Sequence, residues 1–150
     1  MESATPHLYG TMVAMLWSRR QLAALLGAPA APAEKPRLQS QVFSWESLPV
    51  RQNGENRVRA ILDGAMHTGY PLEMHATELA PGGAPHGSHA HANDELIVVR
   101  EGTLEVIVAG RPSKIGPGSV VYVNSGEEHG VRNAGSGHAH YYIIALGAKR

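Results

Sequence analysis

A short segment near the middle of the chain carries three side chains that commonly bind metal ions, at regular spacing. They are His89, His91 and Glu95. If the segment is an extended strand, residues of equal parity point to the same face, so two imidazoles and a carboxylate converge. The spacing therefore predicts a metal site that takes most of its ligands from one segment.

A fourth ligand is expected further along the chain. His129 follows a strand-like Val-Val-Tyr-Val run and a glycine-containing turn at residues 124–126, and a hairpin there would bring its imidazole against the first three ligands. Three imidazoles and one carboxylate suit Fe(II), Mn(II), Ni(II), Cu(II) or Zn(II), and an octahedral shell would keep two positions open. Open positions are typical of a metal that acts on a bound molecule, because purely structural sites have closed shells.

Both clusters resemble the two sequence motifs of the cupin superfamily. The first motif, G-x5-H-x-H-x3-E-x6-G, is met by Gly83, His89, His91, Glu95 and Gly102. The second, G-x5-P-x-G-x2-H-x3-N, is met by Gly118, Gly126, His129 and Asn133. Asn124 stands where the family usually has proline, and asparagine is itself a good turn residue. The resemblance covers about residues 70–146.

This resemblance implies an all-β fold, a small jelly-roll barrel (a double-stranded β-helix) with a metal ion near the barrel axis. It does not imply one reaction, because cupins include dioxygenases, isomerases, lyases, aminohydrolases and sugar-binding proteins. A length of 150 residues allows one such barrel.

The pattern of short apolar runs separated by turn residues agrees with a barrel. A short turn or helix is expected around Ser44-Trp45-Glu46. Strands are expected at 57–62, 72–79, 96–99, 104–108, 120–123 and 141–146. The predicted organisation is a leader at 1–33, an extension with the first strand at 34–69, and the cupin barrel at 70–150.

The first 33 residues have the composition of an export signal. Arg19 and Arg20 precede an Ala- and Leu-rich segment, and Ala31-Pro32-Ala33 fits a cleavage site. The pattern resembles a twin-arginine signal and predicts a periplasmic or exported protein, with Met15 as an alternative start. The alternative is an amphipathic or disordered leader on a cytoplasmic protein.

Overall composition argues against several other classes. Lys+Arg and Asp+Glu are equal at 13 each, so no excess charge indicates nucleic-acid binding. The chain has no cysteine, so neither a disulfide framework nor a thiolate ligand can form. No apolar run is long enough to span a bilayer.

Candidates for substrate contact are His75, Tyr122 and Tyr141. His75 lies mid-strand and either faces the barrel interior or is exposed, because one sequence does not fix strand register. One of the neighbours Tyr141 and Tyr142 should point inward. His86 is expected at the barrel mouth rather than as a fifth ligand.

Two functional hypotheses stay open at this point. In the first, the protein is an enzyme in which the metal polarises a small oxygen-bearing substrate and Glu95 also acts as a base. In the second, it is a non-catalytic module that binds a sugar or organic acid. Either would be expected as a homodimer.

Overall fold

A computed structural model describes residues 35–147 of the chain. Within this range the regular secondary structure consists of strands, apart from one 3-10 turn, η1 (Trp45–Ser47). The strands are β1 (Val50–Asn53), β2 (Asn56–Ala65), β3 (Pro71–Leu79), β4 (Asp94–Glu101), β5 (Leu104–Val108), β6 (Arg111–Ile115), β7 (Val120–Val123), β8 (His129–Asn133) and β9 (Ala139–Leu146).

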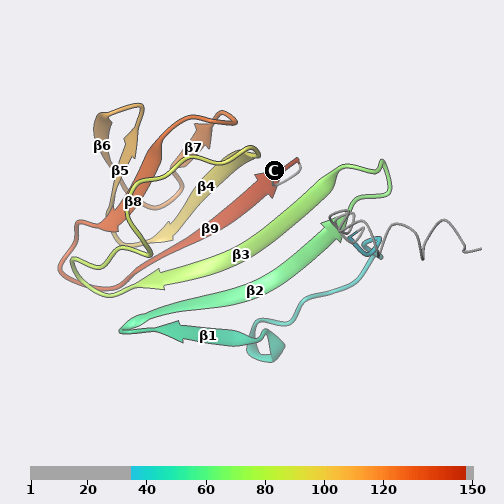
Figure 1. The fold of residues 1–150 in the computed structure, drawn as a ribbon. Coiled ribbons are helices and arrows are strands. Elements are labelled where there is room, and N and C mark those ends of the chain that lie inside the picture. The colour runs from blue at the N-terminus through green and yellow to red at the C-terminus, as the bar shows by residue number, and fades with distance from the viewer. Residues whose placement is uncertain (1–34, 148–150) are drawn as a thin grey trace, which may run out of the picture. The chain divides into compact units, whose positions relative to one another are not determined.

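The strands form two antiparallel sheets (Figure 1). The larger sheet has the order β1-β2-β3-β9-β4-β7, and the smaller has the order β6-β5-β8. Neighbours such as β3, β9 and β4 are far apart in sequence. The chain therefore passes repeatedly between the sheets, as the jelly-roll expectation requires.

The core lies between the two sheets, where alternate residues of β4, β5 and β9 point inward. Burial alternates along all three strands, as a sheet with one packed face requires. The buried cluster consists of Leu79, Ile97, Val99, Leu104, Val106, Ala139, Tyr141 and Ile143. Each large side chain buried here contributes roughly 1.5–3 kcal/mol, so this cluster holds the two sheets together.

Strand register fixes which residues share the inner face of the larger sheet. Ala145 on β9 pairs with Glu73 on β3 and with Glu95 on β4. One step along, Ile143 pairs with His75 and with Ile97. Directly paired residues of antiparallel strands point to the same face, so two carboxylates face inward on either side of a small alanine.

Most of the expected strands are present, but three were missed. The bounds predicted for β5 and β7 agree with the structure, whereas β1, β6 and β8 were not predicted as strands. The first strand is β1, not the segment at 57–62, and residues 54 and 55 form the turn between β1 and β2. β6 begins at Arg111, directly after the turn at residues 109 and 110.

The predicted leader at 1–33 and the alternative start at Met15 lie outside the described residues. Within residues 35–147, no helix has the length and apolar character needed to cross a membrane.

Candidate metal centre

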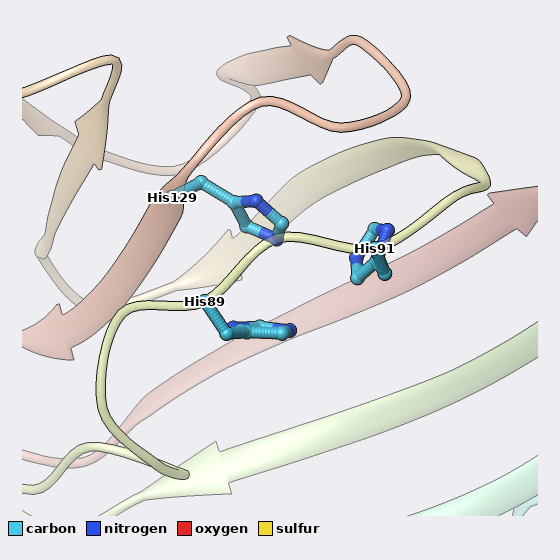
Figure 2. Close-up of side chains that lie close together, drawn as sticks. All are labelled: His89, His91 and His129. Carbon is cyan, nitrogen blue, oxygen red and sulfur yellow. The ribbon is translucent and has the colours of Figure 1, made fainter.

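Three of the four expected ligands come together at one point. The candidate donor nitrogens of His89, His91 and His129 all lie within 4.8 Å of one another, and Figure 2 shows the three rings directed toward a common centre. The ring centroid of His129 lies 4.7 Å from that of His89 and 4.7 Å from that of His91. Imidazole nitrogens at such separations can share one metal ion.

The rings converge for a different reason from the one expected. His89 and His91 do not lie on a continuous strand, because β4 begins only at Asp94. Instead, His89 forms an isolated antiparallel bridge with His129, with both backbone N–H···O bonds at 2.9 Å. A second contact holds the loop that carries His91. The backbone carbonyl of His91 accepts a 2.7 Å hydrogen bond from the N–H of Gly126.

The expected hairpin before His129 is also wrong. β7 pairs with β4 in the larger sheet, whereas β8 pairs with β5 in the smaller one. The turn at 124–126 therefore carries the chain from one sheet to the other. His129 reaches the centre because β8 begins at this crossing, opposite the loop that holds His89.

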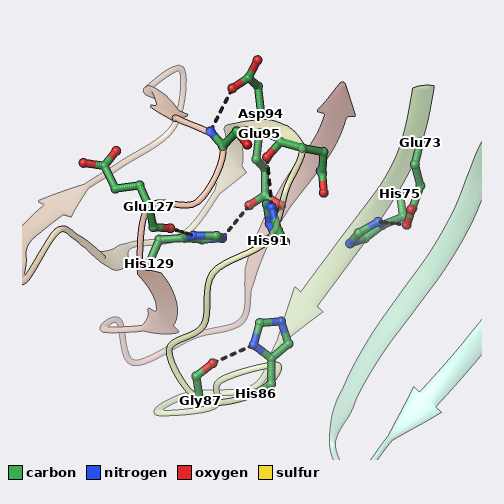
Figure 3. A network of polar contacts seen from close by, with 11 residues as sticks. Glu73, His75, His86, Gly87, His91, Asp94, Glu95, Glu127 and His129 are labelled. Atoms are coloured by element: carbon green, nitrogen blue, oxygen red, sulfur yellow. Dashed lines mark hydrogen bonds and ion pairs between the residues drawn. The ribbon is translucent and has the colours of Figure 1, made fainter. Parts of the chain in front are cut away.

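Glu95 lies beside this cluster and is 8% exposed. Its Oε2 is 3.1 Å from Nε2 of His91, and its Oε1 is 3.5 Å from Nε2 of His129. Figure 3 shows the carboxylate between these two imidazoles. A carboxylate in this position completes a set of three nitrogens and one oxygen, which suits a divalent transition metal.

Backbone carbonyls orient two of the rings. Nδ1 of His91 lies 3.0 Å from the Asn93 carbonyl, and Nδ1 of His129 lies 2.9 Å from the Glu127 carbonyl. An N–H donated to each carbonyl fixes the tautomer and turns Nε2 toward Glu95. Metal-binding histidines are usually held by this kind of outer hydrogen bond.

Two buried nitrogens support a metal in this position. Among the described residues, Nδ1 of His89 and Nε2 of His129 have no hydrogen-bond partner. Buried polar atoms are rarely left without a partner, and a metal ion coordinated here would satisfy both. Burial lowers the pKa of His89 below its usual value, and the neighbouring His86, His129 and His91 lower it further. The ring is therefore held in the neutral form that binds metals.

The loop that carries Ser88 and His89 lies close to β8 at Gly130. A Cβ at Gly130 would lie 2.6 Å from Oγ of Ser88, the residue immediately before His89. The absence of a side chain thus lets residues 88 and 89 sit directly against the strand that carries His129.

The cluster opens into a cavity of about 340 Å³. On the β3 side it is lined by Glu73, His75 and Thr77, and on the β9 side by Tyr141, Ile143 and Ala145. Burial raises the pKa of Tyr141 above its usual value, so its phenol stays protonated. The cavity thus combines polar side chains with an apolar floor, as small-molecule sites commonly do.

The structure brings some of the predicted substrate residues to this cavity and not others. His75, Tyr141 and His86 line it. Tyr122 does not: it is 54% exposed on β7 and contacts Asp94. Its partner across the sheet is Leu96, which follows the inward-facing Glu95, so both point away from the cavity.

Glu73 is the ionisable lining residue that the sequence reasoning did not single out. Its Oε1 lies 3.5 Å from Nδ1 of His75, two residues along the same strand. The available signal was this i, i+2 spacing, which places an acid and a histidine on one face of a strand.

Comparison with known proteins adds a family and a fold. A search of curated protein sequences found no match. Residues 75–145 match the family described as "Cupin domain", and this segment contains all four expected ligands.

Three solved structures with a similar fold are distant in sequence. A predicted oxalate decarboxylase from Thermotoga maritima is 18% identical with a TM-score of 0.62, over 72% of this chain and 100% of that one. An RmlC-like cupin from Shewanella frigidimarina is 21% identical with a TM-score of 0.61, over 73% and 94%. A polyketide cyclase from Streptomyces resistomycificus is 21% identical with a TM-score of 0.60, over 74% and 82%. Their likeness shows the all-β jelly-roll fold, and the family match identifies residues 75–145 of this chain as a cupin domain.

Proposed function

We propose that this protein is a metal-dependent enzyme that acts on a small oxygen-bearing substrate. One divalent transition metal, Fe, Mn, Ni, Cu or Zn, is held by His89, His91, His129 and Glu95. The observation that carries the proposal is the convergence of three imidazoles within 4.8 Å, beside a buried carboxylate and at the end of a cavity.

The donor set favours a metal that works on a bound molecule. Four protein ligands in an octahedral shell leave two positions for substrate or water. The metal would supply Lewis-acid polarisation of a substrate oxygen. The protein contributes the shape of the cavity, the fixed orientation of His91 and His129, and the polar groups around the substrate.

The residues on the cavity wall opposite the metal ligands favour an enzyme over a non-catalytic binding module. Glu73, His75 and Tyr141 all line the cavity there. Convergent ionisable and hydroxyl groups around a metal are typical of catalytic sites, whereas a binding module needs only shape and a few fixed contacts. The proposal covers four kinds of reaction, namely those of a dioxygenase, an isomerase, a lyase and an aminohydrolase.

The experiment is a turnover assay with chelator-treated protein before and after metal is restored. Small 2-oxo and 2-hydroxy acids and simple sugars are incubated in air and under nitrogen, and each mixture is examined by mass spectrometry. Chemical conversion that needs restored metal and is lost in His91→Ala supports the enzyme. Stoichiometric retention of an unchanged compound supports the binding module, and the absence of both contradicts this proposal.

The remaining expectations about cellular context stay predictions. Export depends on residues outside the described range, and the homodimer and the lack of nucleic-acid binding are not tested by the fold.

A further inference from the structure

The two sheets differ in the face that each turns away from the core. On the smaller sheet this face is polar, because Glu105 of β5 lies between Lys114 of β6 and Arg132 of β8. Antiparallel sheets with one face in water usually have such a polar outer face. On the larger sheet the residues that point away from the core are mostly apolar, and we call this surface the outer apolar face. Six of its side chains are only partly buried: Leu72, Met74, Leu96, Val98, Ile144 and Leu146.

Strand register makes the outer apolar face continuous across the sheet. One row of paired residues runs over β2, β3, β9, β4 and β7, through Leu62, Met74, Ile144, Leu96 and Tyr122. Paired residues of neighbouring antiparallel strands point to the same face. This row therefore forms an unbroken apolar band without a charged residue, and Ile144 lies at its middle.

Charged side chains lie at the two ends of the outer apolar face. One end is a row of ionisable residues, Arg57, Glu78, His140 and Glu101. Beside it, the guanidinium carbons of Arg59 and Arg100 lie 4.6 and 5.2 Å from the centre of the Trp45 ring. The other end carries Asp94, which pairs with Leu146. An apolar centre with a polar rim is the usual composition of a protein interface, and homodimer interfaces have especially apolar centres.

The chain before β1 adds apolar side chains along the β2 side of this face. Leu38 lies over Gly64, since a Cβ at Gly64 would be 2.7 Å from its Cδ2. From this contact the chain passes along β2 to Trp45 in η1 (Figure 1). Between the two contacts, Val42 is 94% exposed and Phe43 is 37% exposed. These side chains are available to a partner that lies on the outer apolar face.

The outer apolar face is flat, so its occupant is a protein surface rather than a small molecule. The hollow beside Trp45 has a volume of about 10 Å³, whereas small-molecule sites usually have about 300 Å³ or more. Five strands at about 4.8 Å spacing, and the residues from Tyr142 to Leu146 with their side chains, give a footprint of about 20 Å by 20 Å, or about 400 Å². Monomers rarely expose a larger apolar patch than this.

A second copy of the chain fits this surface in size and in charge. A standard interface buries about 800 Å² of accessible surface on each partner, which the footprint, the relief of its side chains and the segment with Val42 and Phe43 approach together. A two-fold interface brings the same patch of both copies together. Two copies of the row through Ile144 can meet without repulsion, because the row carries no charge.

We propose that the outer apolar face is the surface through which two copies of this chain form a homodimer, with Ile144 near the two-fold axis. Tyr141 and Ile143, the neighbours of the outward residues on β9, line the cavity on the other side of the sheet. The interface therefore leaves both cavities open to solvent, and it supports the sheet that carries Glu95. This inference does not depend on the metal centre.

The test measures the mass of the full-length protein in solution by sedimentation velocity over a wide range of concentrations. Wild-type protein should be a dimer. Ile144→Lys and Ile144→Glu should each raise the dimer dissociation constant by at least about 100-fold, because each places two unpaired charges in the interface. Ile107→Lys is the matched control, since Ile107 is a partly buried apolar residue on the outer face of the smaller sheet, and it should dimerise like wild type.

A mixture of the two Ile144 variants separates lost contact from lost folding. Residues near a two-fold axis meet their own counterparts, so Ile144→Lys and Ile144→Glu should form a mixed dimer, although neither forms a dimer alone. Misfolded chains would not regain this association.

Three results would overturn the proposal. A monomeric wild type would assign the face to another occupant, either residues 1–34 of the same chain or a different protein. A dimer that Ile144→Lys leaves unchanged would use another surface. Single variants that stay monomeric when they are mixed would show that the substitutions act on the fold rather than on a contact between copies.

Discussion

Replacing Asn133 with alanine should destabilise the fold more than any other change to a polar side chain in this region. Asn133 is 1% exposed. Its Nδ2 donates to the carbonyls of Leu79, at 3.0 Å, and Gly137, at 2.7 Å, and its Oδ1 accepts from the N–H of Gly135 at 2.9 Å. The side chain therefore joins the end of β3, the end of β8 and the loop that leads into β9.

The size of the effect follows from these contacts. Each hydrogen bond contributes about 1 kcal/mol net, so losing three costs about 3 kcal/mol, and leaving the buried Leu79 carbonyl without its partner adds to the loss. In urea unfolding with a slope of about 2 kcal/mol/M, the midpoint should fall by about 1.5 M. Asn133→Asp keeps the shape but places a carboxylate against two carbonyls, so its loss should be at least as large.

The matched control is Ser136→Ala, an exposed residue in the same loop as Gly135 and Gly137. Its midpoint should stay within experimental error of wild type. The reasoning is refuted if Asn133→Ala loses less than about 1 kcal/mol, or if Asn133→Asp is as stable as wild type, because the hydrogen bonds would then contribute little.

Two glycine substitutions test close backbone approaches elsewhere. Gly102 has φ +80°, and a Cβ there would lie 2.7 Å from the Cα of Ala139, so Gly102→Ala should lose about 2–4 kcal/mol of unfolding free energy, measured in urea. Gly130→Ala should push Ser88, and with it His89, away from β8. It should therefore weaken metal binding about tenfold, measured by competition with a chromophoric chelator.

Each of these variants has a control of the same type. Gly110 also has a positive φ, +74°, but a Cβ added there would meet nothing within 4 Å. Gly110→Ala should therefore lose only about 1 kcal/mol of unfolding free energy. Gly87→Ala, in the loop next to Ser88 and in open space, should bind metal like wild type. If Gly110→Ala costs as much as Gly102→Ala, or Gly87→Ala weakens metal binding as much as Gly130→Ala, backbone crowding is not the cause.

Three of the strands that the sequence predicted, β4, β5 and β9, have one buried face along which burial alternates. In β5, burial alternates from Leu104 onward, so its apolar residues recur with period two and mark the strand. β1 is exposed throughout and β6 nearly so, because both lie at sheet edges. An edge strand with polar residues has no such pattern, and Pro112 within β6 is tolerated only at an edge.

The candidate site was found from its residue types, while its geometry depends on distant contacts. The bridge between His89 and His129 joins residues 40 apart in the sequence, in a loop and in a strand of the smaller sheet. Parity along one segment could not predict it. The same limit explains why Tyr122 was wrongly expected at the cavity and why Glu73 was missed. The face on which a side chain lies is set by pairing with strands that are remote in sequence.

The most direct test of the metal centre is elemental analysis of the purified full-length protein beside His129→Ala and His138→Ala. The four-ligand site predicts close to one equivalent of Fe, Mn, Ni, Cu or Zn in the wild type and in His138→Ala, and its loss in His129→Ala. Wild-type protein without bound metal, or unchanged metal content in His129→Ala, would contradict it.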